Sequence, residues 1–123
     1  MKLFIKDLRV QTIIGTKKWE RQKKQNVIIN IEMEFDGEKA AQTDSIAHTI
    51  NYERVIMRII NYVEKSHYFL IEKLATSILS IIMKDNLSIT NATVEVNKPG
   101  ISHLVDSVSI VCSSQDLQFE QEK

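Results

Sequence analysis

Apolar and polar residues alternate along residues 26–36, which predicts a β-strand with one buried face. The residues expected on that buried face are Val27, Ile29, Ile31, Met33 and Phe35. Residues 2–14 are rich in Leu, Ile and Val and stop at Gly15, which indicates a preceding strand. The same alternation predicts two later strands, around residues 92–97 and 107–112.

Two segments in the middle of the chain have the 3.6-residue period of amphipathic helices. The first covers residues 52–65, with Asn51 placed to cap its N-terminus, and the second covers about 70–85. Their apolar stripes are Val55, Ile56, Ile59, Ile60 and Val63, and then Ile71, Leu74, Ala75, Ile78 and Ile82. This ββααββ order predicts an α+β fold with a largely antiparallel four-stranded sheet and both helices on its apolar face.

The other face of the predicted sheet is polar. Its residues are Asn30, Glu32, Glu34, Thr93, Glu95, Ser107 and Ser109. This face is either simply solvated or the wall of a hydrated channel formed by several subunits. The open edges of such a sheet must be blunted or paired, and ring closure between protomers would pair them.

Composition indicates a single globular domain that carries no net charge. The chain has 123 residues, 43% of them apolar, and its sixteen basic residues balance sixteen acidic ones. We expect one domain over residues 1–113 and a flexible C-terminal tail over 114–123, because the tail is polar and aperiodic. Zero net charge argues against a protein that coats nucleic acid or an anionic membrane.

The sequence contains none of the common signals for a membrane span, a secreted protein or a metal site. No apolar run approaches the roughly 18–20 residues that a membrane span needs, and charges interrupt the apolar residues at the N-terminus. The lone Cys112 excludes a disulfide framework, and the three histidines are widely spaced without a metal-binding motif. We therefore expect a cytoplasmic protein without a metal.

Four polar residues are predicted at the ends of elements, where chemistry is often placed. Glu20 lies in the first long loop, Tyr52 opens the first helix, Glu72 lies in the first turn of the second helix, and Lys98 ends the third strand. Each also has a structural explanation: Glu72 would complement the helix dipole, Tyr52 would be a half-buried aromatic, and Lys98 would protect a strand edge.

Five motifs in register nevertheless resemble the dihydroneopterin aldolase family across residues 2–113. They are residues 15–25, Thr43-Asp44, Ile50–Tyr52, Leu70–Ala75 and Lys98–Gly100. The resemblance implies the tunnelling fold, in which subunits assemble into a β-barrel ring. It also implies a homo-oligomer, a tetramer or octamer, with sites at the subunit interfaces.

The resemblance further implies cleavage of a small pterin, 7,8-dihydroneopterin, in folate biosynthesis, with C2′ epimerisation as a related activity and without a cofactor. By analogy, Glu72 and the backbone at Ile71 bind the pterin ring, and Lys98 acts as general acid and base. Glu20 contacts the hydroxylated side chain, and Tyr52 of a neighbouring subunit assists proton transfer. We interpret Asp44 and Asn51 first as turn and cap residues.

Two features leave an alternative open within the same fold. The first loop is basic, through Lys17, Lys18, Arg21, Lys23 and Lys24, and is either a solvated loop or an anion site suited to a triphosphate. Residues 105–109 resemble the sister family, dihydroneopterin triphosphate 2′-epimerase, whereas residues 19–22 and 98–100 resemble the aldolase. We favour the aldolase. A non-catalytic oligomeric binding protein is a remote alternative, because nucleic-acid-binding motifs are missing.

Overall fold

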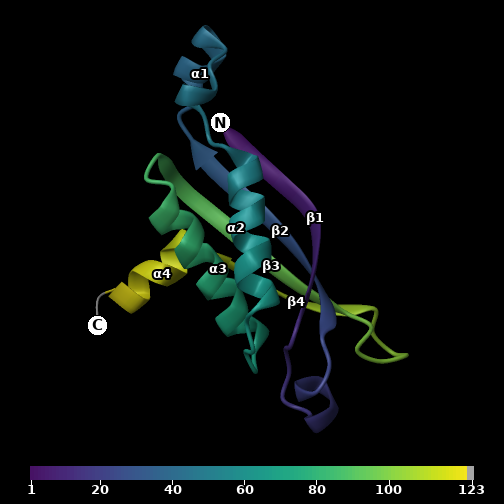
Figure 1. Cartoon of the computed structure of the whole chain (residues 1–123). Coiled ribbons are helices and arrows are strands. Elements are labelled where there is room, and N and C mark those ends of the chain that lie inside the picture. The colour runs from purple at the N-terminus through teal and green to yellow at the C-terminus, as the bar shows by residue number, and fades with distance from the viewer. Residues whose placement is uncertain (122–123) are drawn as a thin grey trace.

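Four antiparallel strands form one sheet in the order β1-β2-β3-β4, and helices α2 and α3 cover one of its faces (Figure 1). The computed structural model describes the backbone of residues 1–121 and the side chains of residues 1–117. The elements are β1 (Lys2–Thr12), the 3₁₀ helix η1 (Lys18–Arg21), β2 (Gln25–Phe35), α1 (Glu38–Thr43), the 3₁₀ helix η2 (Ile46–His48), α2 (Tyr52–Glu64), α3 (Ile71–Asp85), β3 (Ile89–Pro99), β4 (Ser107–Ser113) and α4 (Ser114–Gln121). The predicted α+β fold with its four-stranded sheet is confirmed. Within the described residues, no helix has the length and apolar character needed to cross a membrane.

The hydrophobic core lies between the sheet and helices α2 and α3. On β2 the predicted face is buried, with Val27, Ile29, Ile31 and Met33 at most 2% exposed. The helices contribute Val55, Ile59 and Val63 from α2 and Leu74, Ala75, Ile78, Leu79 and Ile82 from α3. The hydrophobic period of each element therefore identified the face that packs in the core.

Local signals at the start of α2 fix the position of Tyr52. The Asn51 side chain accepts a hydrogen bond from the backbone N–H of Arg54 at 3.2 Å, so Asn51 is the N-cap. Asp44 ends the preceding helix α1 in the left-handed conformation, with φ +53°. Both residues have the cap and turn roles predicted for them, and Tyr52 is the first residue of α2.

The segment expected to be a flexible tail instead begins as helix α4. The Ser114 hydroxyl accepts a hydrogen bond from the backbone N–H of Ala92 at 2.7 Å and lies 3.1 Å from its carbonyl. Asp116 accepts from the N–H of Ser113 at 2.8 Å, and Leu117 packs against the core. Polar side chains satisfy the backbone at this junction, which a hydrophobic pattern does not reveal. The end of the predicted tail, residues 122–123, lies outside the described residues.

The outer face of the sheet carries a network of polar contacts. Asn30 accepts a hydrogen bond from the Asp7 N–H at 2.7 Å and donates one to Glu95 at 2.9 Å. The Lys2 ammonium nitrogen lies 3.2 Å from a carboxylate oxygen of Glu32 and 3.6 Å from one of Glu34. In the sheet of one chain, β1 and β4 are the two edge strands, each paired along one side.

Candidate functional site

The carboxylate of Glu20 and the ammonium group of Lys98 form a largely enclosed ion pair at one end of the sheet. Glu20 lies in η1 and Lys98 near the end of β3, and their side chains are only 8% and 15% exposed. Lys98 is on the helix-covered side of the sheet because it shares its strand face with the buried Val94 and Val96. Two residues selected from the sequence are thus in direct contact.

Neighbouring residues hold the Glu20 carboxylate in this position. One oxygen accepts from the backbone N–H of Lys17 at 3.1 Å, and the other lies 3.5 Å from Nε2 of Gln25. Gln25 is itself fixed, because the same nitrogen donates to the Ile14 carbonyl at 2.7 Å. On the other side, a Cβ on Gly15 would lie under 3.0 Å from both carboxylate oxygens. The carboxylate therefore occupies space that exists because residue 15 is glycine.

The environment of Glu20 favours its ionised form. Burial by itself would raise the pKa of this carboxyl, but the Lys98 ammonium and the Lys17 N–H stabilise the carboxylate more strongly. The net result is a pKa below the ordinary value of 4.5. At neutral pH, Glu20 is therefore a carboxylate that can accept hydrogen bonds from Lys98 and from a ligand hydroxyl.

Helix α3 begins with a different kind of site, an exposed carboxylate on an uncapped first turn. Glu72 lies in that turn directly after Ile71, and its side chain is exposed. The N-cap residue Leu70 has an apolar side chain and makes no side-chain cap hydrogen bond. The first N–H groups of α3 and the Glu72 carboxylate can therefore offer donors and acceptors together to one ligand.

Backbone contacts bring the start of α3 to the end of the molecule that holds Glu20. The N–H of Gly15 donates to the Tyr68 carbonyl at 3.3 Å, and the Thr12 hydroxyl donates to the Ser66 carbonyl at 3.0 Å. These bonds join the β1–β2 connection to the α2–α3 connection. Glu20, Lys98, Ile71 and Glu72 consequently belong to one end of the fold.

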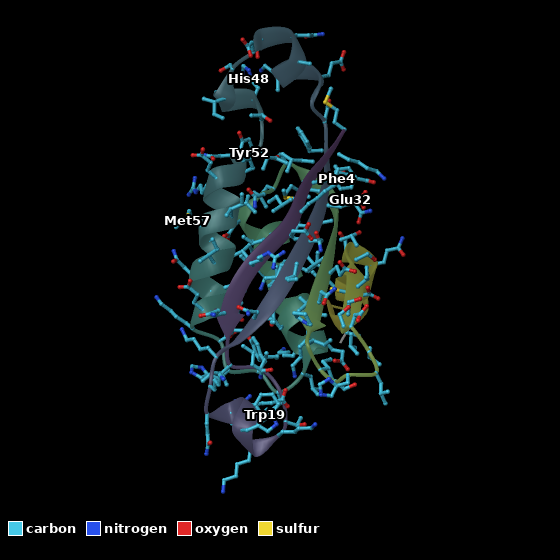
Figure 2. The ribbon with its side chains drawn as sticks, turned by 90° about the vertical axis from the view of Figure 1, so that its right-hand side faces the viewer. Phe4, Trp19, Glu32, His48, Tyr52 and Met57 are labelled. Atoms are coloured by element: carbon cyan, nitrogen blue, oxygen red, sulfur yellow. The ribbon has the colours of Figure 1, made fainter. Side chains whose placement is uncertain are left out.

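Tyr52 is the exception among the selected residues. Figure 2 shows it at the start of α2, at the opposite end of the molecule from Trp19, the neighbour of Glu20. The Tyr52 side chain is 53% exposed. Within one chain, Tyr52 is therefore not brought together with Lys98, and a shared site requires a second copy.

Two grooves in the described surface also lie outside this cluster. They have volumes of about 530 and 470 Å³, and both are lined by residues of α2, the first together with the end of α3 and the second together with the α2–α3 connection. Glu20, Glu72 and Lys98 line neither of them.

Three residues around Glu20 have roles that the sequence pattern does not reveal: Gly15, Arg21 and Gln25. Gly15 and Gln25 shape the space around the carboxylate, as described above. Arg21 was counted with the basic residues of the loop, but its guanidinium donates to backbone carbonyls. The exposed cations of this segment are therefore Lys17, Lys18, Lys23 and Lys24.

The chemistry of the remaining reactive groups is limited. Among the side chains that the structure describes, no group of three or more His, Cys, Asp and Glu is placed to hold a metal ion. The Cys112 thiol is buried, and this burial raises its pKa to about 11. Cys112 is therefore protonated at neutral pH and unsuited to act as a nucleophile.

Comparisons with known proteins agree with the motifs and the fold. The family model "FolB: Dihydroneopterin aldolase" matches residues 3–113. The dihydroneopterin triphosphate 2′-epimerase of Pseudomonas aeruginosa is 37% identical over 106 residues, 86% of this chain and 85% of that protein. The dihydroneopterin aldolase of Haemophilus influenzae is 33% identical over 98 residues, 80% and 82% of the two chains.

A solved structure extends this agreement to three dimensions. The Escherichia coli dihydroneopterin aldolase in complex with neopterin superposes with a TM-score of 0.87 at 26% identity, covering 92% of this chain and 97% of that chain. The resemblance inferred from the five sequence motifs is therefore confirmed. The chain belongs to the FolB dihydroneopterin aldolase family, in which some relatives are named aldolases and others triphosphate epimerases.

Proposed function

We propose that this protein is a dihydroneopterin aldolase. It would cleave the C1′–C2′ bond of 7,8-dihydroneopterin to give 6-hydroxymethyl-7,8-dihydropterin and glycolaldehyde. The observation that carries the proposal is the enclosed Glu20–Lys98 pair at the same end of the fold as the exposed Glu72. One group of residues would bind the ring, and the other would transfer protons at the side chain.

Glu72 would anchor the pterin ring. Its two carboxylate oxygens match the 2-amino and N3–H donors of the pyrimidinone, and charged hydrogen bonds of this kind are strong. The N–H groups at the start of α3, beginning at Ile71, would donate to the ring carbonyl. The helix dipole would help to keep Glu72 ionised, as this pairing requires.

Lys98 and Glu20 would act on the hydroxylated side chain. Removal of the 2′-hydroxyl proton lets the C1′–C2′ electron pair flow into the C6=N5 imine of the dihydropterin, which releases glycolaldehyde and leaves an enamine. Protonation of the enamine at C1′ gives the product. The substrate supplies its own electron sink, so the scheme uses no cofactor. In this scheme the neutral amine form of Lys98 would take the 2′-hydroxyl proton, and the ammonium so formed would protonate C1′. Glu20 would orient the side-chain hydroxyls and Lys98.

Tyr52 would enter the site from a second copy of the chain. We propose a ring in which edge strands β1 and β4 of neighbouring copies pair, as a tetramer or as an octamer of two rings. The Tyr52 end of one copy would then meet the Lys98 end of the next. The sheet's polar face would line the ring, and the enzyme would work in the cytoplasm.

Mixed oligomers test this arrangement. Tyr52→Phe and Glu72→Ala subunits should each be inactive alone. When the two are co-assembled in equal amounts, about a quarter of the interfaces should carry both intact residues and regain activity, since each site draws them from different chains. If verified mixed oligomers regained no activity, the two residues would not act together across an interface, and the shared site would be contradicted.

The epimerase remains the second candidate, because of a specific observation. Four exposed lysines flank Glu20 in the sequence, in η1 and directly beside it, and they could bind the triphosphate of dihydroneopterin triphosphate. The relatives at 37% and 35% identity are also named as triphosphate epimerases.

Supplying the two substrates separately distinguishes the candidates. Glycolaldehyde released from unphosphorylated dihydroneopterin, measured by chromatography, would support the aldolase. Inversion at C2′ of the triphosphate without cleavage would support the epimerase and contradict our main proposal. A Lys98→Met variant controls for non-enzymatic breakdown of the substrate.

A further inference from the structure

The guanidinium group of Arg21 joins the two connections that carry the halves of the candidate site. It donates to the Gly15 carbonyl at 3.1 Å and to the Tyr68 carbonyl at 2.9 Å, and a third hydrogen bond reaches the His67 carbonyl. The guanidinium carbon also lies 4.1 Å from the centre of the Phe69 ring. Arg21 thus contacts one residue of the β1–β2 connection and three consecutive residues of the α2–α3 connection.

These contacts lie next to the residues of the site on both sides. Glu20 directly precedes Arg21 in η1, and Ile71 and Glu72 follow Phe69 at the start of α3. Two hydrogen bonds described above, from the Gly15 N–H and from the Thr12 hydroxyl, also join these two connections. The position of Glu72 relative to the Glu20–Lys98 pair therefore depends on how Arg21 holds the two connections together.

We infer that Arg21 is a positioning residue that fixes the spacing between the ring anchor Glu72 and the proton-transfer pair Glu20–Lys98. This inference rests on the proposed function, because it needs one substrate to engage both groups at once. A reacting group displaced by about 1 Å can lower the rate by about 10²-fold. The junction consequently controls catalysis even though Arg21 touches backbone and Phe69 rather than the groups proposed to react.

Arginine suits this role better than lysine. Its planar guanidinium offers five N–H donors in fixed directions and can stack on an aromatic ring while it binds several carbonyls. A lysine ammonium keeps the charge but cannot reproduce the planar stacking and the fork of donors. The conservative Arg21→Lys substitution therefore separates geometry from charge.

Steady-state kinetics of Arg21→Lys test the inference, with Lys84→Ala as a control that removes an exposed cation in the last turn of α3, at the opposite end of that helix from Glu72. We expect Arg21→Lys to lower kcat/KM for dihydroneopterin by about 10²-fold, mostly through kcat. The affinity for the product 6-hydroxymethyl-7,8-dihydropterin should change less than about threefold, because the product needs mainly the Glu72 anchor. Lys84→Ala should stay within about threefold of the parent protein in both measurements.

Chemical rescue distinguishes positioning from a loss of stability. Guanidinium chloride below denaturing concentrations should restore part of kcat to Arg21→Ala, and ammonium chloride at the same ionic strength should not. Amide hydrogen exchange should become faster at residue 15 and in residues 66–70 of Arg21→Lys, and not in Lys84→Ala. A variant that was merely less stable would melt earlier, without specific rescue and without a change in kcat per folded molecule.

The outcomes separate this inference from the proposed function. A parent protein that neither binds pterins nor cleaves dihydroneopterin would contradict the proposed function, and the catalytic role of Arg21 with it. An active parent protein with an Arg21→Lys variant of equal kcat and equal amide exchange would overturn the inference about Arg21 alone.

Discussion

Replacing Gly15 with alanine tests whether the space beside residue 15 holds the Glu20 carboxylate against Lys98. The backbone of Gly15 has φ +125°, a conformation that residues with a side chain rarely adopt. An added methyl group would also collide with the Glu20 carboxylate. The substitution therefore strains the backbone and forces Glu20 away from its present contacts.

The expected loss of stability follows from these two effects. Backbone strain of this kind costs about 1–3 kcal/mol. Displacement of Glu20 removes hydrogen bonds that involve charged groups, which are worth about 1.5–3 kcal/mol. We therefore expect Gly15→Ala to lower the free energy of unfolding by about 2.5–6 kcal/mol. Urea unfolding followed by the fluorescence of Trp19, the single tryptophan, measures this change.

Gly100 supplies a matched control near the same site. It also has a positive φ, +69°, but a Cβ there would meet nothing within 4 Å. Gly100→Ala should therefore cost only about 1–2 kcal/mol of backbone strain. In a Glu20→Ala background, Gly15→Ala should likewise cost only its backbone strain, since the collision is gone. If Gly15→Ala lowered the free energy of unfolding equally with and without the Glu20 side chain, residue 15 would not be what holds the carboxylate in place.

Three further predictions concern the charged groups of the site. Glu72→Gln should weaken neopterin binding in calorimetric titration by about 10–100-fold, from the loss of a charged hydrogen bond, while Glu53→Gln, in the first turn of α2, should leave it unchanged. Lys98→Met should still bind the hydroxymethyl product but turn over dihydroneopterin at least about 10²-fold more slowly, and near-normal turnover would require a different base. Because the folded-state pKa of Glu20 is lowered, its ionisation stabilises the fold fully above the ordinary value of 4.5, and this contribution disappears as the pH falls through the lower, folded-state pKa. The stability advantage over Glu20→Gln in urea unfolding should accordingly shrink below about pH 4.5, and a difference that stayed constant down to pH 2 would contradict this assignment.

The order and type of the main elements were predictable because each has a strong local signal. The alternation in β2 and the 3.6-residue period in α2 and α3 mark faces that must be buried, and the structure buries them. Asn51 and Asp44 act as cap and turn residues through bonds to their own neighbourhood. Helix α4 was not predicted, because its first residue is held by Ala92, which lies 22 positions earlier in the chain.

The candidate site shows the same limit more clearly. Residues 15–24 are too polar for a core by composition, yet Glu20 is buried because its partner Lys98 comes from 78 positions away. Arg21 likewise finds the Tyr68 carbonyl 47 positions away. The sequence identified Glu20 and Lys98 as separate candidates, and their pairing required the folded sheet. The roles of Glu72 and Tyr52 in a shared site stay predictions until two copies are tested together.

The buried and exposed parts of the site have different physical tasks. Glu20 and Lys98 can be enclosed because they neutralise each other, since an unpaired buried charge is strongly unfavourable. Groups held in this way are already oriented when the substrate arrives, which lowers the cost of reorganisation in the transition state. Glu72 and Tyr52 are exposed, so each can exchange water for a ligand or a second copy. Because one chain keeps Tyr52 far from Lys98, we expect dilution below the assembly concentration to lower kcat more steeply than the affinity for the pterin ring. Equal loss of both would contradict this division.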